Sequence, residues 1–276
     1  MAGTMLFVEL FSLVVLAVFV AVDGDRRATL RDAGLVALGA FLGEDSCIRL
    51  YEYYAYSPGW HVFLDRVPLV VLLIWPAVVL SATKIAKAIA PRASALRLGA
   101  MVMGIVVFDA ALIEPIAVHA GLWHWAHSGI FHVPVIGILG WGFYAGAIVV
   151  ALESLRGSRR LLAPPLAALA THAMLLAAHW GLFRYVLRFE LAFHVSLGLI
   201  VPAALAYAQV VVRTRATLGP GDLVARALAT SLFVVLLARS PSLPLVLYAS
   251  AFTLPHLVLV AQSLRTLRAG PRGIGA

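Results

Sequence analysis

Long apolar runs recur along the whole chain and constrain its fold more than any other feature. A helix that crosses the ~30 Å hydrocarbon core of a bilayer needs roughly 20 apolar residues. The runs lie near residues 5–22, 67–83, 98–118, 133–152, 162–183, 190–212, 223–239 and 242–262. The sequence therefore predicts an all-α protein, a polytopic bundle of transmembrane helices that sits in the cell membrane as a multi-pass protein.

A ninth run, near 33–50, is long enough to cross but carries Glu44, Asp45 and Arg49. Basic residues collect in short cytoplasmic loops. Four basic connections fall on one face, at 84–97, 153–161, 213–226 and the tail from 265. The basic loop at 23–32 joins that face only if the ninth run also crosses. The charges thus favour nine spans over eight, with the N-terminus outside and the C-terminus inside.

The composition agrees with lipid as the main solvent of the chain. Hydrophobic residues make up 62% and charged residues 12%, against about 45–50% and 25% in soluble domains. No linker divides the sequence, so we expect a single integral membrane domain over 1–276, with its first run kept as an anchor. The net charge of +8 is spread over several loops instead of forming one stripe, so we expect no nucleic-acid partner.

Two polar regions interrupt the apolar pattern and resemble each other. Each has an acid-bearing helix end, a connection rich in aromatic residues and histidine, and a Val-Pro pair that opens the next helix. A tryptophan follows the proline by seven residues in both, at Trp75 after Pro68 and at Trp141 after Pro134. The pattern predicts an internal repeat of two helix-loop-helix units. The predicted units cover about 33–83 and 98–152.

Four acids lie within these regions, in otherwise apolar helix segments. The offset of 66 residues between the prolines aligns Glu44 with the neighbour of Asp109. A charge at the centre of a span costs at least ~2.5–3.5 kcal/mol on insertion scales, which favours a functional role for Glu44, Asp45, Asp109 and Glu114. Nine spans put both regions at the outer end of the bundle, and paired repeats commonly frame membrane sites. The tryptophans and tyrosines nearby could equally form an interfacial aromatic belt.

Histidines raise the alternative of a metal site. His119, His124, His127 and His132 lie in one connection, and imidazoles with carboxylates can hold a transition metal. The closely spaced histidine sets typical of membrane di-iron desaturases are absent, so we expect no metal. The sequence also has no phosphate-binding glycine loop and no Asp-rich diphosphate motif, so we expect no cofactor. His172 could instead form a hydrogen bond between helices.

The second polar region carries a resemblance to a known family. It reads Asp109, Glu114-Pro115, Ala117, Gly121, Trp123, Trp125, Pro134 and Gly140-Trp141. This pattern resembles the membrane carotenoid-biosynthesis proteins that include bisanhydrobacterioruberin hydratase and the γ-carotene 1′-hydroxylase type, and the first region resembles their other block. Together the regions cover 44–75 and 109–141, about a quarter of the chain.

Three departures from the family pattern leave the subfamily and the substrate open. Glu114 stands where an aspartate is expected, and Gly137 stands where relatives carry asparagine. The glycines expected before the tyrosine pair are replaced around Arg49 and Leu50.

The resemblance implies a carotenoid hydratase that adds water to a terminal double bond of an acyclic or monocyclic carotenoid. A buried carboxylic acid can protonate the alkene, aromatic faces can stabilise the tertiary cation, and a second carboxylate or a histidine can take a proton from water. We expect Asp109 and Glu114 to be the acid and base, in an order that the sequence leaves open, with Glu44 and Asp45 in support. The residues expected to contact substrate are Tyr53, Tyr54, Trp123, His124, Trp125 and Trp141.

Two other functions remain open at this point. A carotenoid cyclase would begin with the same protonation but exclude water, so that a neighbouring double bond captures the cation. A transporter or structural membrane protein would use the acids in a substrate or proton path. The expected partners are a lipid-soluble polyene substrate, membrane lipids and other enzymes of the pathway.

Overall fold

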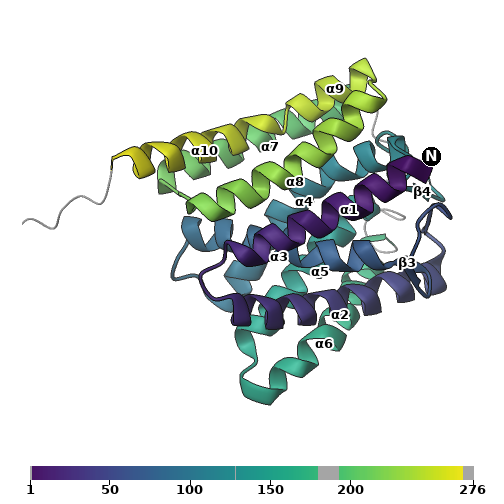
Figure 1. The fold of residues 1–276 in the computed structure, drawn as a ribbon, viewed down its shortest axis with the longest axis horizontal. Helices are drawn as coiled ribbons and strands as arrows, with labels where there is room; N and C mark the ends of the chain where they lie inside the picture. The colour runs from purple at the N-terminus through teal and green to yellow at the C-terminus, as the bar shows by residue number, and fades with distance from the viewer. Residues whose placement is uncertain (1, 128, 180–192, 270–276) are drawn as a thin grey trace, which may run out of the picture.

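A computed structural model describes residues 2–127, 129–179 and 193–269. Most of the described chain is helical, as predicted, and most helices run along the horizontal of Figure 1. The helices are α1 (Ala2–Ala21), α2 (Arg26–Tyr51), α3 (Leu69–Ile89), α4 (Ala95–His119), α5 (Val135–Ser154), α6 (Ala163–Leu176), α7 (Phe193–Thr214), α8 (Pro220–Arg239), α9 (Leu243–Ser250) and α10 (Thr253–Arg268), with a 3-10 helix η1 (Gly157–Leu162). The prediction of an all-α membrane bundle is confirmed.

The helices long and apolar enough to cross a membrane number seven within the described chain. An eighth crossing forms if α9 and α10, bent by 41° at their junction, count as one span. The predicted spans 162–183 and 190–212 correspond to α6 and α7, apart from residues 180–192, which lie outside the described residues. The ninth predicted span, 33–50, lies within α2, which has 26 residues but too many charges to belong to this apolar group.

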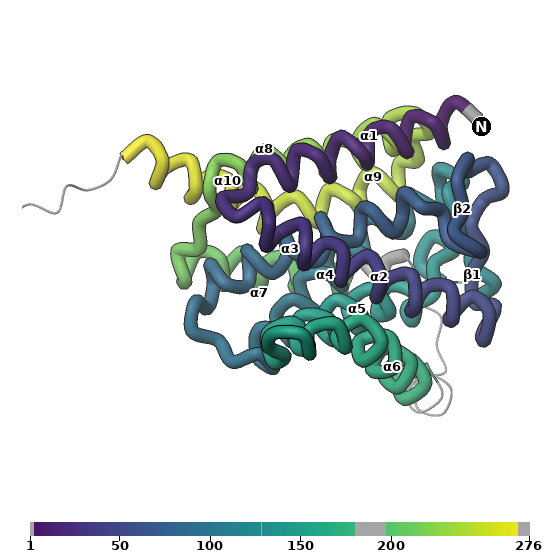
Figure 2. The backbone as a smooth tube through the Cα atoms, turned by 60° about the horizontal axis from the view of Figure 1, so that its bottom comes forward, coloured from purple at the N-terminus to yellow at the C-terminus, as the bar shows by residue number. Residues whose placement is uncertain are grey.

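Helix α2 nevertheless packs inside the bundle against α3 and α6. Figure 2 shows α1 and α8 side by side along the top of the bundle, α6 at the bottom, and α2 between α1 and α6. The start of α1 and the end of α10 lie at opposite ends of the bundle (Figure 1). This placement of the two chain ends is accounted for if α2 crosses the bundle like the other long helices, because the chain then crosses an odd number of times.

Short strands connect the helices at the end of the bundle where α1 begins, which we call the strand end. Strand β1 (Tyr54–Tyr56) pairs antiparallel with β4 (Trp123–Trp125), and β2 (Phe63–Leu64) pairs with β3 (Val67–Pro68). The sequence predicted only connections here, since a strand of two or three residues has no periodicity to detect. Pro68 and Pro134 are the N-caps of α3 and α5, which confirms their predicted place at helix starts.

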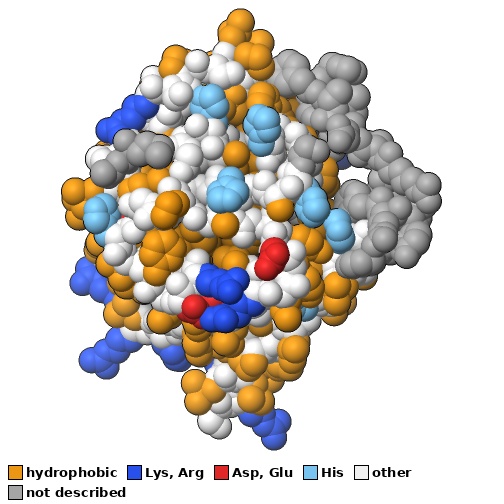
Figure 3. Space-filling model, turned by 90° about the vertical axis from the view of Figure 1, so that its right-hand side faces the viewer, with side chains coloured by type: hydrophobic (Ala, Val, Ile, Leu, Met, Phe, Trp, Pro, Cys, Tyr) orange, Lys and Arg blue, Asp and Glu red, His pale blue; other side chains and the backbone are white. Residues whose placement is uncertain are grey.

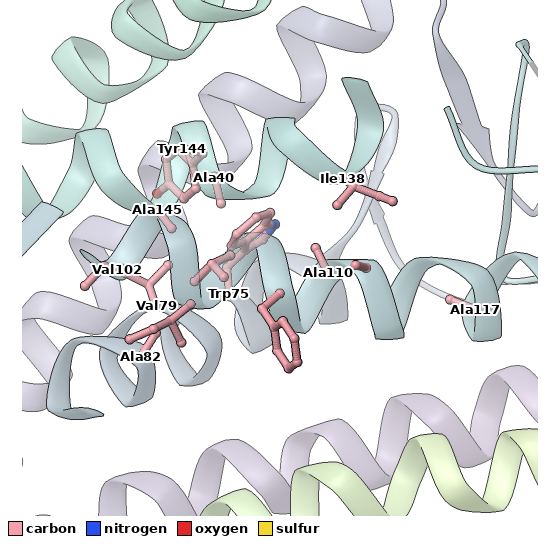
Figure 4. Close-up of a cluster of buried hydrophobic side chains, with 14 of the residues drawn as sticks. Ala40, Trp75, Val79, Ala82, Val102, Ala110, Ala117, Ile138, Tyr144 and Ala145 are labelled. Atoms are coloured by element: carbon pink, nitrogen blue, oxygen red, sulfur yellow. The ribbon is translucent and has the colours of Figure 1, made fainter. Parts of the chain in front are cut away.

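Glycines bring α4 and α5 into close contact. A Cβ atom on Gly99 would lie 2.8 Å from the carbonyl oxygen of Gly146, so only small residues allow the two backbones to approach this closely. Larger side chains fill the remaining space: in Figure 4, Val79 on α3 and Val102 on α4 lie close together, with Trp75 nearby. This packing holds α3, α4 and α5 as one unit around the candidate site.

The two ends of the bundle differ in charge. Figure 3 shows the strand end, where histidines gather around one cluster of arginine and acid side chains. The opposite, basic end carries an ion network in which Lys84 pairs with Asp23 at 2.8 Å and with Asp222. Partial burial works against the charge of Asp23, but Lys84 lowers the pKa of this carboxyl group below its usual value. The positive-inside rule predicts that this basic end faces the cytoplasm.

Candidate functional site

An elongated, mainly apolar cavity of about 610 Å³ lies inside the bundle. Its walls include residues from Val8 to Phe19 on α1, a stretch of about 16 Å at the helical rise of 1.5 Å per residue. The volume falls within the range of about 300–1,000 Å³ that is typical of small-molecule sites. The ionisable or imidazole-bearing residues on its walls include Glu44, Asp109, Glu114, Arg226 and His256.

Glu114 is the most unusual of these residues, because three indole N–H groups donate to its carboxyl group. Trp123 and Trp125 donate to Oε2 at 2.8 and 2.9 Å, and Trp141 donates to Oε1 at 2.6 Å. Glu114 is only 2% exposed. Its place in the last part of α4, just before Pro115, directs it toward β4 and the first half of α5. Among the residues described, its buried oxygens therefore accept hydrogen bonds from three neutral indoles.

Glu44 on α2 has a matching environment built from phenols. Tyr56 donates to Oε2 at 2.9 Å, Tyr54 donates to the same oxygen, and the indole of Trp75 donates to Oε1 at 3.0 Å. Burial, and next the nearby Glu44, raise the pKa of the Tyr54 and Tyr56 phenols well above their usual value. Both phenols therefore keep their protons at neutral pH.

The two carboxyl groups occupy equivalent places in the two helix-loop-helix units. In each unit the glutamate receives two hydrogen bonds from the strand that follows its helix and one from the tryptophan seven residues after the proline. The strands pair with each other, Tyr54 opposite Trp125, and the rings of Trp75 and Trp141 lie 4.6 Å apart. The geometry thus pairs Glu44 with Glu114, whereas the offset between the prolines had aligned it with the neighbour of Asp109.

Gly137, one of the departures from the family pattern, makes room for this arrangement. A Cβ atom on Gly137 would lie 2.5 Å from the Trp125 ring. Any larger residue, including asparagine, would displace the indole that donates to Glu114. The absence of a side chain at Gly137 therefore leaves the space that the Trp125 ring occupies.

Asp109 lines the same cavity but belongs to a different cluster. Its carboxylate pairs with the Arg226 guanidinium at 3.0 Å and lies 3.5 Å from His256 Nε2. Arg226 also donates to Ser81 Oγ at 3.0 Å. The sequence placed Arg226 in the basic connection 213–226, and this was wrong: it lies in the second turn of α8 and on the cavity wall. A basic residue inside the predicted apolar run 223–239 was the signal for it, and His256 inside the run 242–262 gave a similar one.

The other predicted site residues divide between the cavity and the surface. Tyr53 is buried and lines the cavity. Asp45 does not line the cavity; its carboxylate pairs with Arg49 at 2.7 Å on the outer side of α2. His124 is exposed on β4, on the strand face opposite Trp123 and Trp125. The structure therefore brings together Glu44, Glu114, Tyr53, Tyr54, Trp123, Trp125 and Trp141, and it leaves Asp45 and His124 apart.

The histidines on the described chain do not converge on a metal. No group of three or more His, Cys, Asp or Glu side chains that could hold an ion occurs in the described ranges. His119 pairs with the backbone oxygen of Ser240 at 2.8 Å. His172 contacts Ser46 Oγ at 2.7 Å and the Tyr51 hydroxyl at 2.9 Å, which confirms its predicted hydrogen bonding between helices.

Comparison with known proteins places the site in a family. A family model described as "Carotenoid biosynthesis protein" matches residues 10–213. The matched region includes both glutamates and their hydrogen-bond donors, and it ends before α8 and α10. Searches of curated proteins and of solved structures find no match.

Proposed function

The chain belongs to the carotenoid biosynthesis protein family, and from this premise we propose that it is a carotenoid hydratase. The proposed reaction adds water to a terminal double bond of an acyclic or monocyclic carotenoid, without a cofactor. The protein would act in the cell membrane, where a polyene dissolved in lipid can enter sideways between helices and pass to other enzymes of the pathway.

The observation that carries this proposal is the pair of buried glutamates at the aromatic part of an apolar cavity. Each carboxyl group is held by three neutral donors, and two indoles, tilted by 39° to each other, lie between them. An apolar cavity suits a hydrocarbon chain. Aromatic faces stabilise a carbocation by roughly 2 kcal/mol or more when water is excluded. The site thus offers proton transfer and cation stabilisation together.

The donors differ in a way that assigns the acid and the base. Indole N–H groups only donate, so Trp123, Trp125 and Trp141 require Glu114 to act as an acceptor. Phenol hydroxyls both donate and accept, so Tyr54 can accept a hydrogen bond from a protonated Glu44. We therefore assign Glu44 as the acid and Glu114 as the base.

The reaction then balances without any further reactant. The Glu44 proton adds to one alkene carbon, the π electrons form the new C–H bond, and a tertiary cation remains on the other carbon. Water attacks this cation while Glu114 takes one of its protons. One C–H and one C–O bond form, the double bond is lost, and proton exchange restores the starting charges.

Asp109 fits this role less well than the glutamates. Its ion pair with Arg226 favours the ionised form, which cannot donate a proton. Asp109 also lies five residues before Glu114 on α4, a rise of about 7.5 Å along the helix axis at 1.5 Å per residue. We assign Asp109 to the wall of the cavity that holds the rest of the substrate.

Expression in a lycopene-producing host tests the proposal. We expect a new carotenoid that has gained the mass of one water. Glu44→Gln and Glu114→Gln should each abolish it, whereas Glu153→Gln, at an exposed ion pair with Lys87, should retain it. A product with a new ring and unchanged mass would identify a cyclase instead. Unchanged pigment with the folded wild-type protein would refute both.

Deuterium labelling separates the two glutamates. In membranes suspended in D2O, Glu114→Gln should still incorporate deuterium into recovered substrate, because protonation and its reversal need only Glu44. Glu44→Gln should incorporate none. The opposite result would reverse the assignment of acid and base.

A further inference from the structure

A second hollow, of about 560 Å³, lies on the outside of the bundle at the basic end. It forms where the first turns of α2 meet η1, on the side where α2 and α6 lie together (Figure 2). Its walls are Leu30, Arg31, Gly34, Leu35, Arg156, Gly157, Arg160 and Leu161. It shares no lining residue with the cavity that holds the glutamates.

The hollow has an excess of positive charge. Its three arginines face one nearby acid, Asp32, which pairs with Arg31 at 3.0 Å and with Arg160 at 3.1 Å. Arg156 is exposed and forms no ion pair within the described parts of the chain. The arrangement therefore leaves room for a further negative charge.

Arg160 supplies a second, independent observation that points to an anion. Its Nε atom is buried and has no hydrogen-bond partner among the residues described. An unpaired buried donor on a charged group is costly. An anion in the hollow would satisfy it, and guanidinium groups match the planar, two-pronged geometry of phosphate oxygens.

Apolar side chains beside the arginines indicate what carries the anion. Leu30 and Leu161 line the hollow and are 57% and 69% exposed. They lie next to the basic loops, which places them where the headgroup region meets the acyl chains. Basic pockets between helices on the cytoplasmic side are typical sites for anionic lipid headgroups.

We propose that this hollow binds an anionic phospholipid, with its phosphate against Arg31, Arg156 and Arg160. The first part of its acyl chains lies over Leu30 and Leu161. The bound lipid bridges α2 and η1, and so stabilises the packing of the helix that carries Glu44. This site is independent of the reaction proposed for the cavity.

Native mass spectrometry of the full-length protein in neutral detergent tests the proposal. The probes are phosphatidylglycerol, phosphatidylcholine with the same acyl chains, and inorganic phosphate. We expect phosphatidylglycerol to bind preferentially. Arg156→Gln, which breaks no ion pair, should weaken it about fivefold, because one basic residue near the surface contributes about 1 kcal/mol. Arg159→Gln is the matched control, since Arg159 lies three residues further on, in η1, but does not line the hollow.

The outcomes separate a lipid from a soluble anion. Retained phosphatidylglycerol binding in Arg159→Gln, together with the loss in Arg156→Gln, supports the site. Equal binding of the two lipids, or equal loss in the two variants, overturns it. Inorganic phosphate that binds as tightly as phosphatidylglycerol would also overturn it, in favour of a soluble anion.

Discussion

Replacing each glutamate with glutamine should have unequal effects on stability, although the two sites look alike. At position 114 the amide oxygen can accept from the Trp123 and Trp125 indoles, but the amide nitrogen then faces the Trp141 N–H. The amide N–H and the indole N–H are both donors, so no hydrogen bond forms between them. In the flipped amide, two indoles lose their acceptor instead of one. Glu114→Gln therefore always leaves at least one buried indole donor unpaired.

The cost follows from the hydrogen bonds that are lost. A buried unpaired donor costs about 1–3 kcal/mol, and the bonds that remain fall from the charged to the weaker neutral class. We expect Glu114→Gln to lower the free energy of unfolding by about 2–4 kcal/mol. At position 44 the amide oxygen accepts from Trp75, and the amide nitrogen donates to a phenol oxygen of Tyr54 or Tyr56. Glu44→Gln should therefore cost under about 1 kcal/mol.

Unfolding by SDS titration in mixed micelles measures this difference. We would compare the wild type with Glu44→Gln, Glu114→Gln and the control Glu153→Gln at one pH. The helical circular dichroism signal would report the unfolding. Equal destabilisation of the two buried variants, or none at position 114, would refute the reasoning from indole and phenol chemistry. It would leave open whether the protein converts carotenoids, which the pigment assay tests separately.

Three further substitutions test other contacts. Asp109→Asn leaves Arg226, whose side chain is only 18% exposed, without its counter-charge. It should lower the unfolding free energy by about 3–5 kcal/mol, whereas Asp109→Leu combined with Arg226→Met should recover most of it in the same titration. Gly137→Ala should displace the Trp125 indole and change the tryptophan emission spectrum; an unchanged spectrum would contradict the close contact. Gly146→Leu should separate α4 from α5 and greatly reduce the yield of folded protein in size-exclusion chromatography, while Gly104→Leu, where nothing lies within 4 Å of an added Cβ atom, should not.

The sequence predicted the bundle well because lipid imposes a simple requirement on a crossing helix. Apolar length located most of the helices, and the two prolines located the starts of α3 and α5. The same rule gave a weaker signal for α2, because the predicted run 33–50 carries three charged residues. These charges are tolerated for separate reasons: Glu44 is satisfied inside by phenols and an indole, and Arg49 pairs with Asp45 outside. The donors to Glu44 lie between 10 and 31 residues away in the chain, so local composition does not show them, whereas Asp45 and Arg49 form a local i,i+4 pair.

The candidate site was predicted in part for a related reason. The repeat singled out the aromatic residues, but an offset counted from the prolines aligned Glu44 with the neighbour of Asp109 instead of with Glu114. The number of residues between Glu114 and Pro134 differs from the number between Glu44 and Pro68. Only the pairing of β1 with β4 shows that the two glutamates occupy equivalent places. Arg226 was counted with a loop because it lies close to one in sequence, although its side chain reaches into the cavity.

The reacting groups and the remaining cavity wall come from different parts of the chain. Both glutamates and all six of their indole and phenol donors belong to the region that matches the carotenoid biosynthesis family. Arg226 and His256, by contrast, come from α8 and α10, beyond the matched residues. If the proposed chemistry is common to relatives, the helices outside the match are where this chain can differ in the polyene it accepts. Substitutions on the cavity side of α8 and α10 should therefore change which carotenoid is converted, while the type of bond formed stays the same.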